Sequence, residues 1–370
     1  MKDFKYSVVI PSYNPDEKLM TVINGLEALG VDDIIVVNDG SAAGCSAYFE
    51  EAASHDSVTL LTHEVNRGKG AALKTAFRYI FENRKDVLGC VTADGDAQHL
   101  PKDIIGCGEL LSDKACGIVL GVRDFSLPHV PKRSKRGNRI TSAVFRIFVG
   151  MKLSDTQTGL RAIPFDLLPK MCEISGERYE YETNMLLEMK SSHIPYSEKV
   201  IETVYIEENK TSHFNPIRDS WRIYKLILAH FARYTLSSLL CLVIEQIIQS
   251  TLYAFSSGLL ASVLTELVSF LPARVISSVV NYILNKKFVF SSDSDNKRSL
   301  VRYYILWFCQ AAVTMLLDWL VAVAIPGTES CVLYTVITLI IKTAIAIVSF
   351  RIQKDWVFDV TQKQSKGGNK

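Results

Sequence analysis

The sequence predicts an α/β domain with a mostly parallel sheet, followed by an all-α membrane domain of four transmembrane helices. Three observations predict this fold class. Apolar runs of strand length alternate with helical patterns in the first part of the chain, and polar motifs follow the early runs. From about Arg233 onward, long apolar stretches dominate.

The α/β part begins with short apolar runs that we expect to be strands. Helical patterns follow the first run, to about Leu29, and the third, from Ala71 to about Asn83. Ligands of such a sheet gather at the carboxyl ends of its strands, where the polar motifs stand. The expected strands are residues 7–10, 34–37, 58–62, 87–91, 117–122 and 200–206.

The composition indicates the cellular compartment and the kind of partner to expect. The eight cysteines include no Cys-x-x-Cys pair, which argues against a zinc site and fits a reducing compartment. A strand follows the N-terminus almost directly, so we expect no cleavable signal peptide and a cytosolic first domain. The formal net charge is only +2, and the sequence contains no motif typical of proteins that recognise nucleic-acid bases. We therefore do not expect nucleic acid to be a partner.

The stretch from Thr92 to His99 is the strongest candidate for a metal site. In an extended segment residues at spacing two share a face, so Asp94, Asp96 and Gln98 can converge on one point. Hard oxygen ligands suit Mg²⁺ or Mn²⁺, and open coordination positions suit a diphosphate. The alternative is an acidic turn that caps the helix before Pro101.

Two further motifs follow strands. Asp39 can accept a hydrogen bond from a nucleobase N–H, although Asp or Ser before Ala42 would equally serve as a helix N-cap. The stretch Asn66-Arg67-Gly68-Lys69-Gly70 offers glycines for close backbone approach and cations for phosphates. It lacks the spacing of a Walker P-loop and is weak evidence alone.

These motifs together resemble glycosyltransferase family 2, within it the polyprenyl- or dolichyl-phosphate sugar transferases, over about residues 5–223. The resemblance implies the nucleotide-diphospho-sugar transferase (GT-A) fold and a divalent metal. One departure from the family pattern is Asn38, where an aspartate usually stands, and it leaves the nucleobase preference open. The matching motifs are Val9–Asn14, Asn38–Ser41, Asn66–Gly70, Asp94–His99, Gly121–Arg123, Ser134–Asn138 and Ser154–Arg161.

The resemblance also implies roles for individual residues. The metal ligands would be Asp94, Asp96 and Gln98, and the catalytic residues Asp94, Asp96, Asp155 and Arg123. The donor would be bound by Pro11, Tyr13, Asn14, Asp39, Ser41, Lys69, Gly70 and Asp94. The acceptor phosphate would be bound by Arg123, Arg133, Ser134, Arg136, Gln157, Arg161, Lys210 and Ser212.

Residues 128–146 are rich in Lys and Arg and are followed by an amphipathic pattern. Such a run is usually a solvated face, but this helix could also lie on an anionic leaflet beside a lipid phosphate. The set from Asp155 to Arg161 is expected to line the active site rather than only to cap the next element. Glu180 and Glu182 open a later helix and are expected outside the set that contacts substrate.

Four apolar spans are expected near residues 234–255, 258–284, 303–325 and 332–350, each close to the roughly 20 residues that cross a bilayer. Intramembrane Glu245, Arg274, Asp318 and Lys342 are costly alone and are expected to pair. The domains would then be residues 1–215, an amphipathic linker at 216–232, and a membrane domain at 233–370.

An internal repeat lies within the membrane domain. Residues 274–290 align with 342–358 at a fixed offset of 68, and the second copy is the more diverged, with Ser349 in place of Asn281. The pattern resembles the GtrA-like four-helix membrane domain. The identities are Val280, Lys286, Val289 and Phe290 with Val348, Lys354, Val357 and Phe358.

The function expected from these features is transfer of a hexose from a nucleotide sugar, UDP-glucose or GDP-mannose, to undecaprenyl or dolichyl phosphate. A polysaccharide synthase is the competing enzyme, but its Gln-x-x-Arg-Trp signature is absent from the sequence. A lipid-linked-sugar translocator or adaptor with a sugar-nucleotide-sensing soluble domain is the alternative from another class. The sequence is compatible with a homo-oligomer and with the plasma membrane of a prokaryote.

The distribution of charge predicts the topology. The loop after the second span and the C-terminal tail each carry five Lys or Arg, whereas residues 326–330 hold only Glu329. By the positive-inside rule, both termini and the 285–302 loop are cytoplasmic and 326–331 faces outward. A membrane-impermeant thiol reagent applied to intact cells should label a single cysteine at Thr328 but not one at Asp295. The reverse pattern would contradict the four-span topology.

Overall fold

The structure is a computed structural model that describes residues 5–128, 130–202, 216–256, 262–290, 292, 294–324 and 332–358. The chain forms two compact units, Met1–Ile223 and Tyr224–Lys370. Helix α8 (Pro216–Ser256) runs through the boundary between them.

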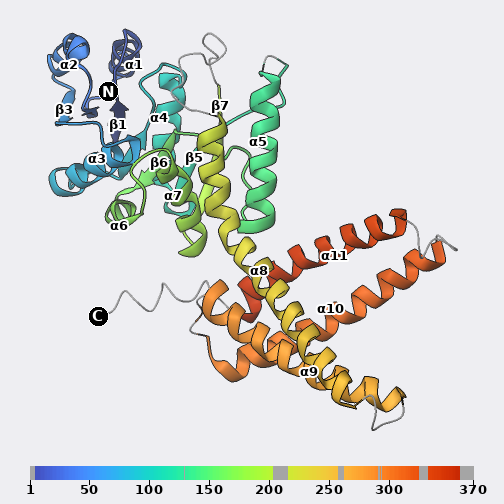
Figure 1. Ribbon diagram of the computed structural model, residues 1–370. Coiled ribbons are helices and arrows are strands. Elements are labelled where there is room, and N and C mark those ends of the chain that lie inside the picture. The colour runs from blue at the N-terminus through green and yellow to red at the C-terminus, as the bar shows by residue number, and fades with distance from the viewer. Residues whose placement is uncertain are drawn as a thin grey trace. The chain divides into compact units, whose positions relative to one another are not determined.

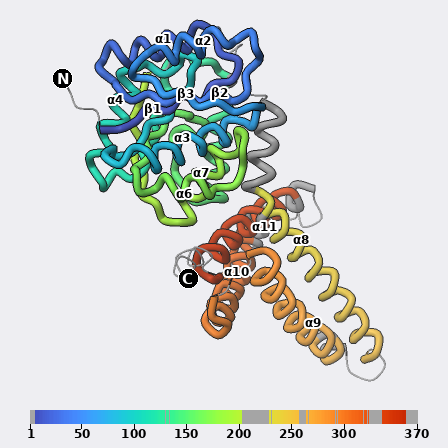
Figure 2. Tube along the Cα trace, turned by 90° about the vertical axis from the view of Figure 1, so that its left-hand side faces the viewer, coloured from blue at the N-terminus to red at the C-terminus, as the bar shows by residue number. Residues whose placement is uncertain are grey.

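The first unit is a three-layer α/β/α sandwich. Helices α1, α2 and α4 cover one face of the sheet, and α3, α6 and α7 cover the other (Figures 1 and 2). The strands are β1 (Ser7–Ser12), β2 (Ile34–Asp39), β3 (Val58–His63), β4 (Gly89–Thr92), β5 (Ile118–Arg123), β6 (Arg161–Pro164) and β7 (Tyr196–Ile201). The helices are α1 (Lys18–Glu27), α2 (Ser46–Ala53), α3 (Lys69–Asn83), α4 (Pro101–Glu109), α5 (Lys132–Val144), α6 (Leu168–Glu173) and α7 (Glu180–Ser191).

The sheet has seven strands in the order β3-β2-β1-β4-β6-β5-β7. All are parallel except β6, which pairs antiparallel with both β4 and β5. The predicted mostly parallel sheet is therefore confirmed. Since β6 runs the other way, its first residue, Arg161, lies at the edge where β4 and β5 end, opposite Thr92 and Leu120.

Two details of the sheet differ from the sequence-based prediction. No strand was expected at β6, because its four residues, Arg-Ala-Ile-Pro, make no apolar run. The strand expected at 200–206 begins earlier, at Tyr196, because β7 pairs in parallel with β5 from Ile118↔Tyr196 to Arg123↔Ile201. As an edge strand β7 is half-buried or exposed except at Ile201, and residues 203–206 lie outside the described part of the chain.

One hydrophobic core of this unit lies between the sheet and the α1, α2 and α4 layer. Leu19, Ile23 and Leu26 of α1 are fully buried against the central strands. Their spacing of three and four residues is the apolar stripe of an amphipathic helix. This packing holds the carboxyl ends of β1, β2 and β4 at one edge of the sheet.

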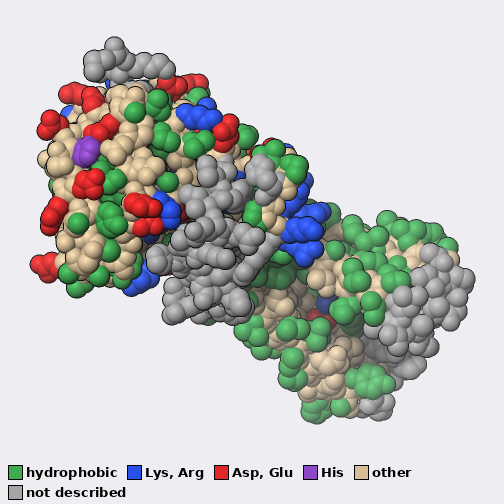
Figure 3. Space-filling model, turned by 90° about the horizontal axis from the view of Figure 1, so that it is seen from above, with side chains coloured by type: hydrophobic (Ala, Val, Ile, Leu, Met, Phe, Trp, Pro, Cys, Tyr) green, Lys and Arg blue, Asp and Glu red, His purple; other side chains and the backbone are tan. Residues whose placement is uncertain are grey.

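The second unit consists of four helices that are long and apolar enough to cross a membrane. The candidate spans are Phe231–Ser256, Leu267–Val289, Asn296–Val321 and Val336–Val357. Apolar side chains spread over the visible surface of this unit (Figure 3), as expected for helices that face lipid. After α8, the helices are α9 (Ser262–Leu284), α10 (Asn296–Ala324) and α11 (Val332–Ile352).

The internal repeat is visible in the second unit. Helices α9 and α11 both continue into a π-helical turn, Asn285–Val289 and Gln353–Val357. Equivalent residues of the two copies contact each other: Asn285 Nδ2 donates to Gln353 Oε1 at 3.0 Å, and the rings of Phe290 and Phe358 stack at 5.2 Å. The two copies of the repeat therefore pack against each other through equivalent residues.

The ionisable residues expected to pair within the membrane do so in part. Arg274 Nη1 lies 2.9 Å from Glu245 Oε1, and its guanidinium also lies over the ring of Trp307. Lys342 makes no ion pair with any residue that the structure describes. The side chain of Asp318 is outside the described residues.

Asn285 should be a strong determinant of stability in the second unit. Its side chain is fully buried, accepts a hydrogen bond from Ser237 Oγ, and donates to Asn281 and Gln353. Asn285→Leu removes these three hydrogen bonds and should cost about 1–2 kcal/mol, which is the range that model peptides give for interhelical hydrogen bonds in membranes. The measurement is thermal unfolding in detergent. Gln246→Leu, an exposed polar-to-apolar change on α8, is the control and should leave the transition unmoved.

Candidate active site

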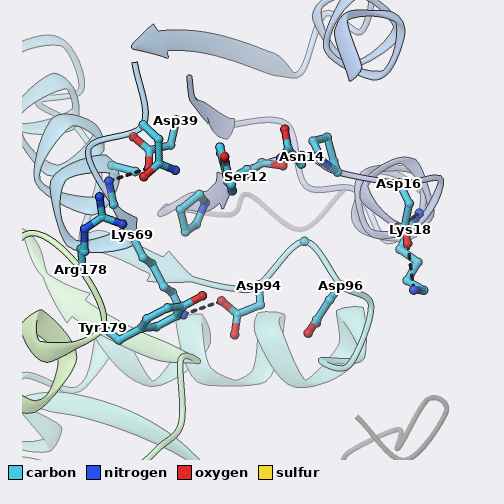
Figure 4. A pocket seen from close by; sticks show the side chains of 17 residues that line it. Ser12, Asn14, Asp16, Lys18, Asp39, Lys69, Asp94, Asp96, Arg178 and Tyr179 are labelled. Carbon is cyan, nitrogen blue, oxygen red and sulfur yellow. Dashed lines mark hydrogen bonds and ion pairs between the residues drawn. The ribbon is translucent and has the colours of Figure 1, made fainter. Parts of the chain in front are cut away.

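The candidate site is a cavity of about 470 Å³ at the carboxyl edge of the sheet. Its walls come from the loops after β1, β2, β3 and β4 and from the segment before α7 (Figure 4). The cavity thus lies where ligands of a parallel sheet are expected. It is lined by Pro11, Ser12, Tyr13, Asn14, Pro15, Asp16, Lys18, Asp39, Asn66, Gly68, Lys69, Ala72, Asp94, Gly95, Asp96, Arg178 and Tyr179.

Asp39 closes one end of the cavity and holds the neighbouring loop. Its carboxylate accepts hydrogen bonds from the backbone N–H of Arg67 at 2.9 Å and of Gly68 at 2.7 Å. His63 Nδ1 lies 2.7 Å from the same carboxylate, and His63 Nε2 bonds Thr75 Oγ1 at 2.9 Å. Asp39 therefore orders the 66–70 loop, and its binding of a nucleobase stays a prediction.

The loops after β1 and β2 are tied together by reciprocal hydrogen bonds. The N–H of Asn14 donates to Ser41 Oγ, and the N–H of Ala42 donates to Asn14 Oδ1, each at 2.9 Å. Asn14 has a positive φ of 49°, a conformation that asparagine tolerates better than most residues. Ser41 thus shapes the wall without lining the cavity, whereas Pro11, Tyr13 and Asn14 line it.

Lys69 links three elements at the other end of the cavity. Its Nζ lies 2.6 Å from Asp94 Oδ1 and 3.0 Å from Glu182 Oε1, so it joins α3 to the loop after β4 and to α7. Burial opposes the charge on Lys69, but the two carboxylates outweigh this effect and raise its pKa. Burial would likewise raise the pKa of Asp94, but Lys69 and neighbouring cations lower it. This ion pair is charged at neutral pH.

Asp96 experiences the opposite electrostatic balance. Burial and the negative charge of Asp94 both raise the pKa of the Asp96 carboxyl. Asp96 Oδ1 accepts the backbone N–H of Gln98 at 3.1 Å, which turns the loop so that both aspartates line the cavity (Figure 4). Two adjacent carboxylates in a half-buried cavity attract a divalent cation, so Asp94 and Asp96 fit the expected metal.

Gln98 differs from the two aspartates in its position relative to the cavity. Its backbone supports the turn, but the residue is not among those that line the cavity. The described residues contain no group of three or more His, Cys, Asp or Glu side chains arranged around one point. His99, whose pKa is lowered by burial, accepts the N–H of Asp94 through Nδ1 at 3.4 Å. Gln98 as third ligand stays a prediction.

Gly159 permits the close packing around Lys69 and Asp94. A Cβ atom there would lie 2.7 Å from Asp94 Oδ2 and 2.9 Å from Lys69 Nζ. The residue belongs to the Asp155–Arg161 stretch, which the sequence assigned to the active site. The backbone of this stretch thus contacts the ion pair directly.

Asp155 and Arg123 form a bidentate ion pair beside this stretch. Arg123 Nε lies 2.6 Å from Asp155 Oδ2, and Arg123 Nη2 lies 3.0 Å from Oδ1. Asp155 is fully buried and also accepts the N–H of Gln157 at 3.0 Å. Its carboxylate therefore positions Arg123 and the turn at Gln157.

The other residues expected at the acceptor phosphate are dispersed. Arg161 is buried and donates to the carbonyl oxygens of Thr158 and Glu182, and burial lowers its pKa. Its Nη2 has no hydrogen-bond partner among the described residues. On α5, Ser134 is half-buried and Arg136 is exposed. The side chain of Arg133 and residues Lys210 and Ser212 lie outside the described part of the chain.

Several residues of the site were not predicted from the sequence. Arg178 and Tyr179 line the cavity, and Glu182, expected outside the set that contacts substrate, does not line it but pairs with Lys69. His63 supports Asp39. Only the position of His63 at the carboxyl end of a strand could have signalled its role, because the others reach the site through the packing of α7 on α3.

Comparison with protein families gives two matches. Residues 7–170 match the model of glycosyl transferase family 2. Residues 233–358 match the model of the GtrA/DPMS transmembrane domain. The chain thus combines a glycosyltransferase family 2 domain with a GtrA/DPMS transmembrane domain. The glycosyltransferase is thus also a membrane protein, as its four apolar helices indicate.

Individual relatives of this glycosyltransferase are similar over its first unit. It is 27% identical over 245 residues to a UDP-N-acetylglucosamine–dolichyl-phosphate N-acetylglucosaminyltransferase of Methanococcus voltae, covering 62% of this chain and 97% of that protein. It is 29% identical over 184 residues to an undecaprenyl-phosphate mannosyltransferase of Micrococcus luteus, covering 48% and 74%. Glucosyl-3-phosphoglycerate synthase from Mycobacterium tuberculosis matches in structure with a TM-score of 0.45, 16% identity and coverage of 61% and 76%.

Gly159→Ala should inactivate the glycosyltransferase without unfolding it. The new methyl group would force apart Lys69 and Asp94, and displacements of about 1 Å at a reacting centre can cost roughly a hundredfold in rate. The measurements are turnover and thermal unfolding of the purified chain. Gly44→Ala is the matched control, because a Cβ there meets no atom within 4 Å. Normal turnover in Gly159→Ala would contradict the packing argument.

Proposed function

We propose that this glycosyltransferase transfers a hexose from a nucleotide sugar to a polyprenyl phosphate. The observation that carries the proposal is the cavity at the carboxyl edge of the sheet, with Asp39 at one end and the adjacent Asp94 and Asp96 at the other. A nucleoside diphosphate fits this arrangement: its base carries hydrogen-bond donors for Asp39, and a divalent cation held by the two aspartates would neutralise its phosphates. UDP-glucose and GDP-mannose are the proposed donors, and undecaprenyl or dolichyl phosphate the proposed acceptor.

The donor side depends on residues fixed before any substrate binds. The Asn14–Ser41 contacts and the Asp39 carboxylate hold the loops of three strands in place. Fixed loops reduce the ordering that binding would otherwise require. Lys69 holds the Asp94 carboxylate in place at the diphosphate end.

A divalent metal held by Asp94 and Asp96, with Gln98 as proposed third ligand, would neutralise the departing diphosphate. This role fits the two adjacent carboxylates, whose mutual repulsion a cation relieves. Mg²⁺ and Mn²⁺ are the proposed ions because both prefer oxygen ligands.

On the acceptor side, the proposed group is a phosphate monoester with a second pKa of about 6, which is largely dianionic at neutral pH. Such a nucleophile needs no proton removed, so no side chain has to act as general base. Asp155 is engaged by Arg123 through two hydrogen bonds, which suits positioning better than proton transfer. Arg123, Arg133, Ser134, Arg136, Gln157, Arg161, Lys210 and Ser212 are the proposed acceptor set.

The relatives support this acceptor. The names of the proteins from Methanococcus voltae and Micrococcus luteus state dolichyl phosphate and undecaprenyl phosphate. A lipid acceptor also accounts for the fusion to four apolar helices. We propose that residues 1–215 form a cytoplasmic catalytic domain, that 216–232 are an amphipathic linker, and that the membrane is the plasma membrane of a prokaryote.

The proposal is tested by incubating membranes that contain the chain with labelled sugar nucleotides and polyprenyl phosphate. Label should enter the lipid fraction, and it should also do so with the purified chain alone. Lack of turnover by the purified chain with every donor would favour a translocator or adaptor.

Asp96→Asn should abolish nearly all turnover, and excess chelator should do the same to the wild-type chain. The substitution removes a negative charge beside Asp94, so thermal stability without metal should be retained or increased. The measurements are lipid-linked label and thermal unfolding at pH 7. Near-normal turnover in Asp96→Asn, or full turnover in chelator, would refute the metal assignment.

A further inference from the structure

The segment that precedes α7 is fixed to the start of α3. The N–H of Ala71 donates to the carbonyl oxygen of Glu177 at 2.9 Å, and Glu182 pairs with Lys69 at 3.0 Å. Within the segment, Glu180 Oε1 accepts the N–H groups of both Glu177 and Arg178 at 3.3 Å. The backbone of Arg178 is therefore held beside the lysine of the cavity.

The glycines of the 66–70 loop make this docking close. A Cβ atom on Gly68 would lie 2.5 Å from the Glu177 carbonyl oxygen and 2.6 Å from Arg178 Cγ, and Gly68 has a φ of 103°. A Cβ atom on Gly70 would lie 2.5 Å from Tyr181 Cβ. The segment before α7 and the first turn of α7 therefore pack directly against both glycines. The aliphatic part of the Arg178 side chain packs against Gly68.

The head group of Arg178 enters the cavity. Arg178 and Tyr179 both line it, and Figure 4 shows Arg178 directed toward the Asp39 end while Lys69 extends toward Asp94. The guanidinium thus lies between the end proposed for the base and the end proposed for the diphosphate.

The charges of the cavity single out this arginine. Among the residues that the structure describes, three cations line the cavity, and two have carboxylate partners: Lys18 pairs with Asp16 at 2.9 Å, and Lys69 lies between Asp94 and Glu182. Arg178 makes no ion pair with any residue described by the structure. Its charge is therefore available to a ligand, and a guanidinium fork matches two phosphate oxygens.

We propose that Arg178 binds the diphosphate of the donor, with Tyr179 forming the adjacent wall. The inference rests on the proposed function, in which the cavity takes a nucleotide sugar. Arg178 supplies charge that the paired Lys69 cannot, because the lysine is already shared by two carboxylates.

The test is calorimetric titration of the purified full-length chain with UDP and GDP in the presence of Mg²⁺, and with the corresponding nucleosides. Arg178→Gln should raise the Kd for the diphosphate roughly ten- to hundredfold, since a hydrogen bond to a charged group is lost. Arg178→Lys should recover part of the affinity. The nucleoside Kd should not change, because a nucleoside has no phosphate.

Arg78→Gln is the matched control, as Arg78 is an exposed arginine of α3 that does not line the cavity. Unchanged diphosphate affinity in Arg178→Gln, with normal wild-type binding, would overturn this inference alone. Equal losses for nucleoside and diphosphate would also overturn it and assign Arg178 to the base or to loop structure. If the wild-type chain binds neither diphosphate, the proposed function fails and this inference with it.

Discussion

The catalytic unit depends on the placement of one ammonium group. Lys69 begins α3, and its Nζ contacts a carboxylate from the loop after β4 and another from α7. A half-buried charge must be paired to be tolerated, so three elements from distant parts of the sequence are drawn to one point. At the same point lie the carboxylates proposed to bind the metal, so the contact that organises the fold also fixes one end of the cavity.

Strand-end residues could be predicted from the sequence because they lie within a few positions of an apolar run. Asp39 ends β2 and Asp94 follows β4 by two residues, so the order of motifs along a parallel sheet was enough to bring them together. Glu182, Arg178 and β6 could not be found this way. Arg161 is a buried cation in a four-residue strand, and α7 reaches the site only by packing on Gly68 and Gly70.

The two sides of the active site are built differently. On the side proposed for the donor, Asp39 holds the backbone N–H groups of Arg67 and Gly68. On the side proposed for the acceptor, Asp155 holds the side chain of Arg123 through two hydrogen bonds. A wall fixed through its backbone suits a small rigid nucleotide. A guanidinium oriented by a carboxylate suits a phosphate, the group that the proposed lipid would bring.

The pairing of Asn285 with Gln353 has a consequence for how the membrane unit is built. These equivalent positions contact each other, yet they hold amides of different length, and the bond runs in one direction, from Asn285 to Gln353. Two copies of one half would place asparagine against asparagine, one methylene shorter than the present pair, or glutamine against glutamine, one methylene longer. At this contact the two halves are complementary rather than interchangeable.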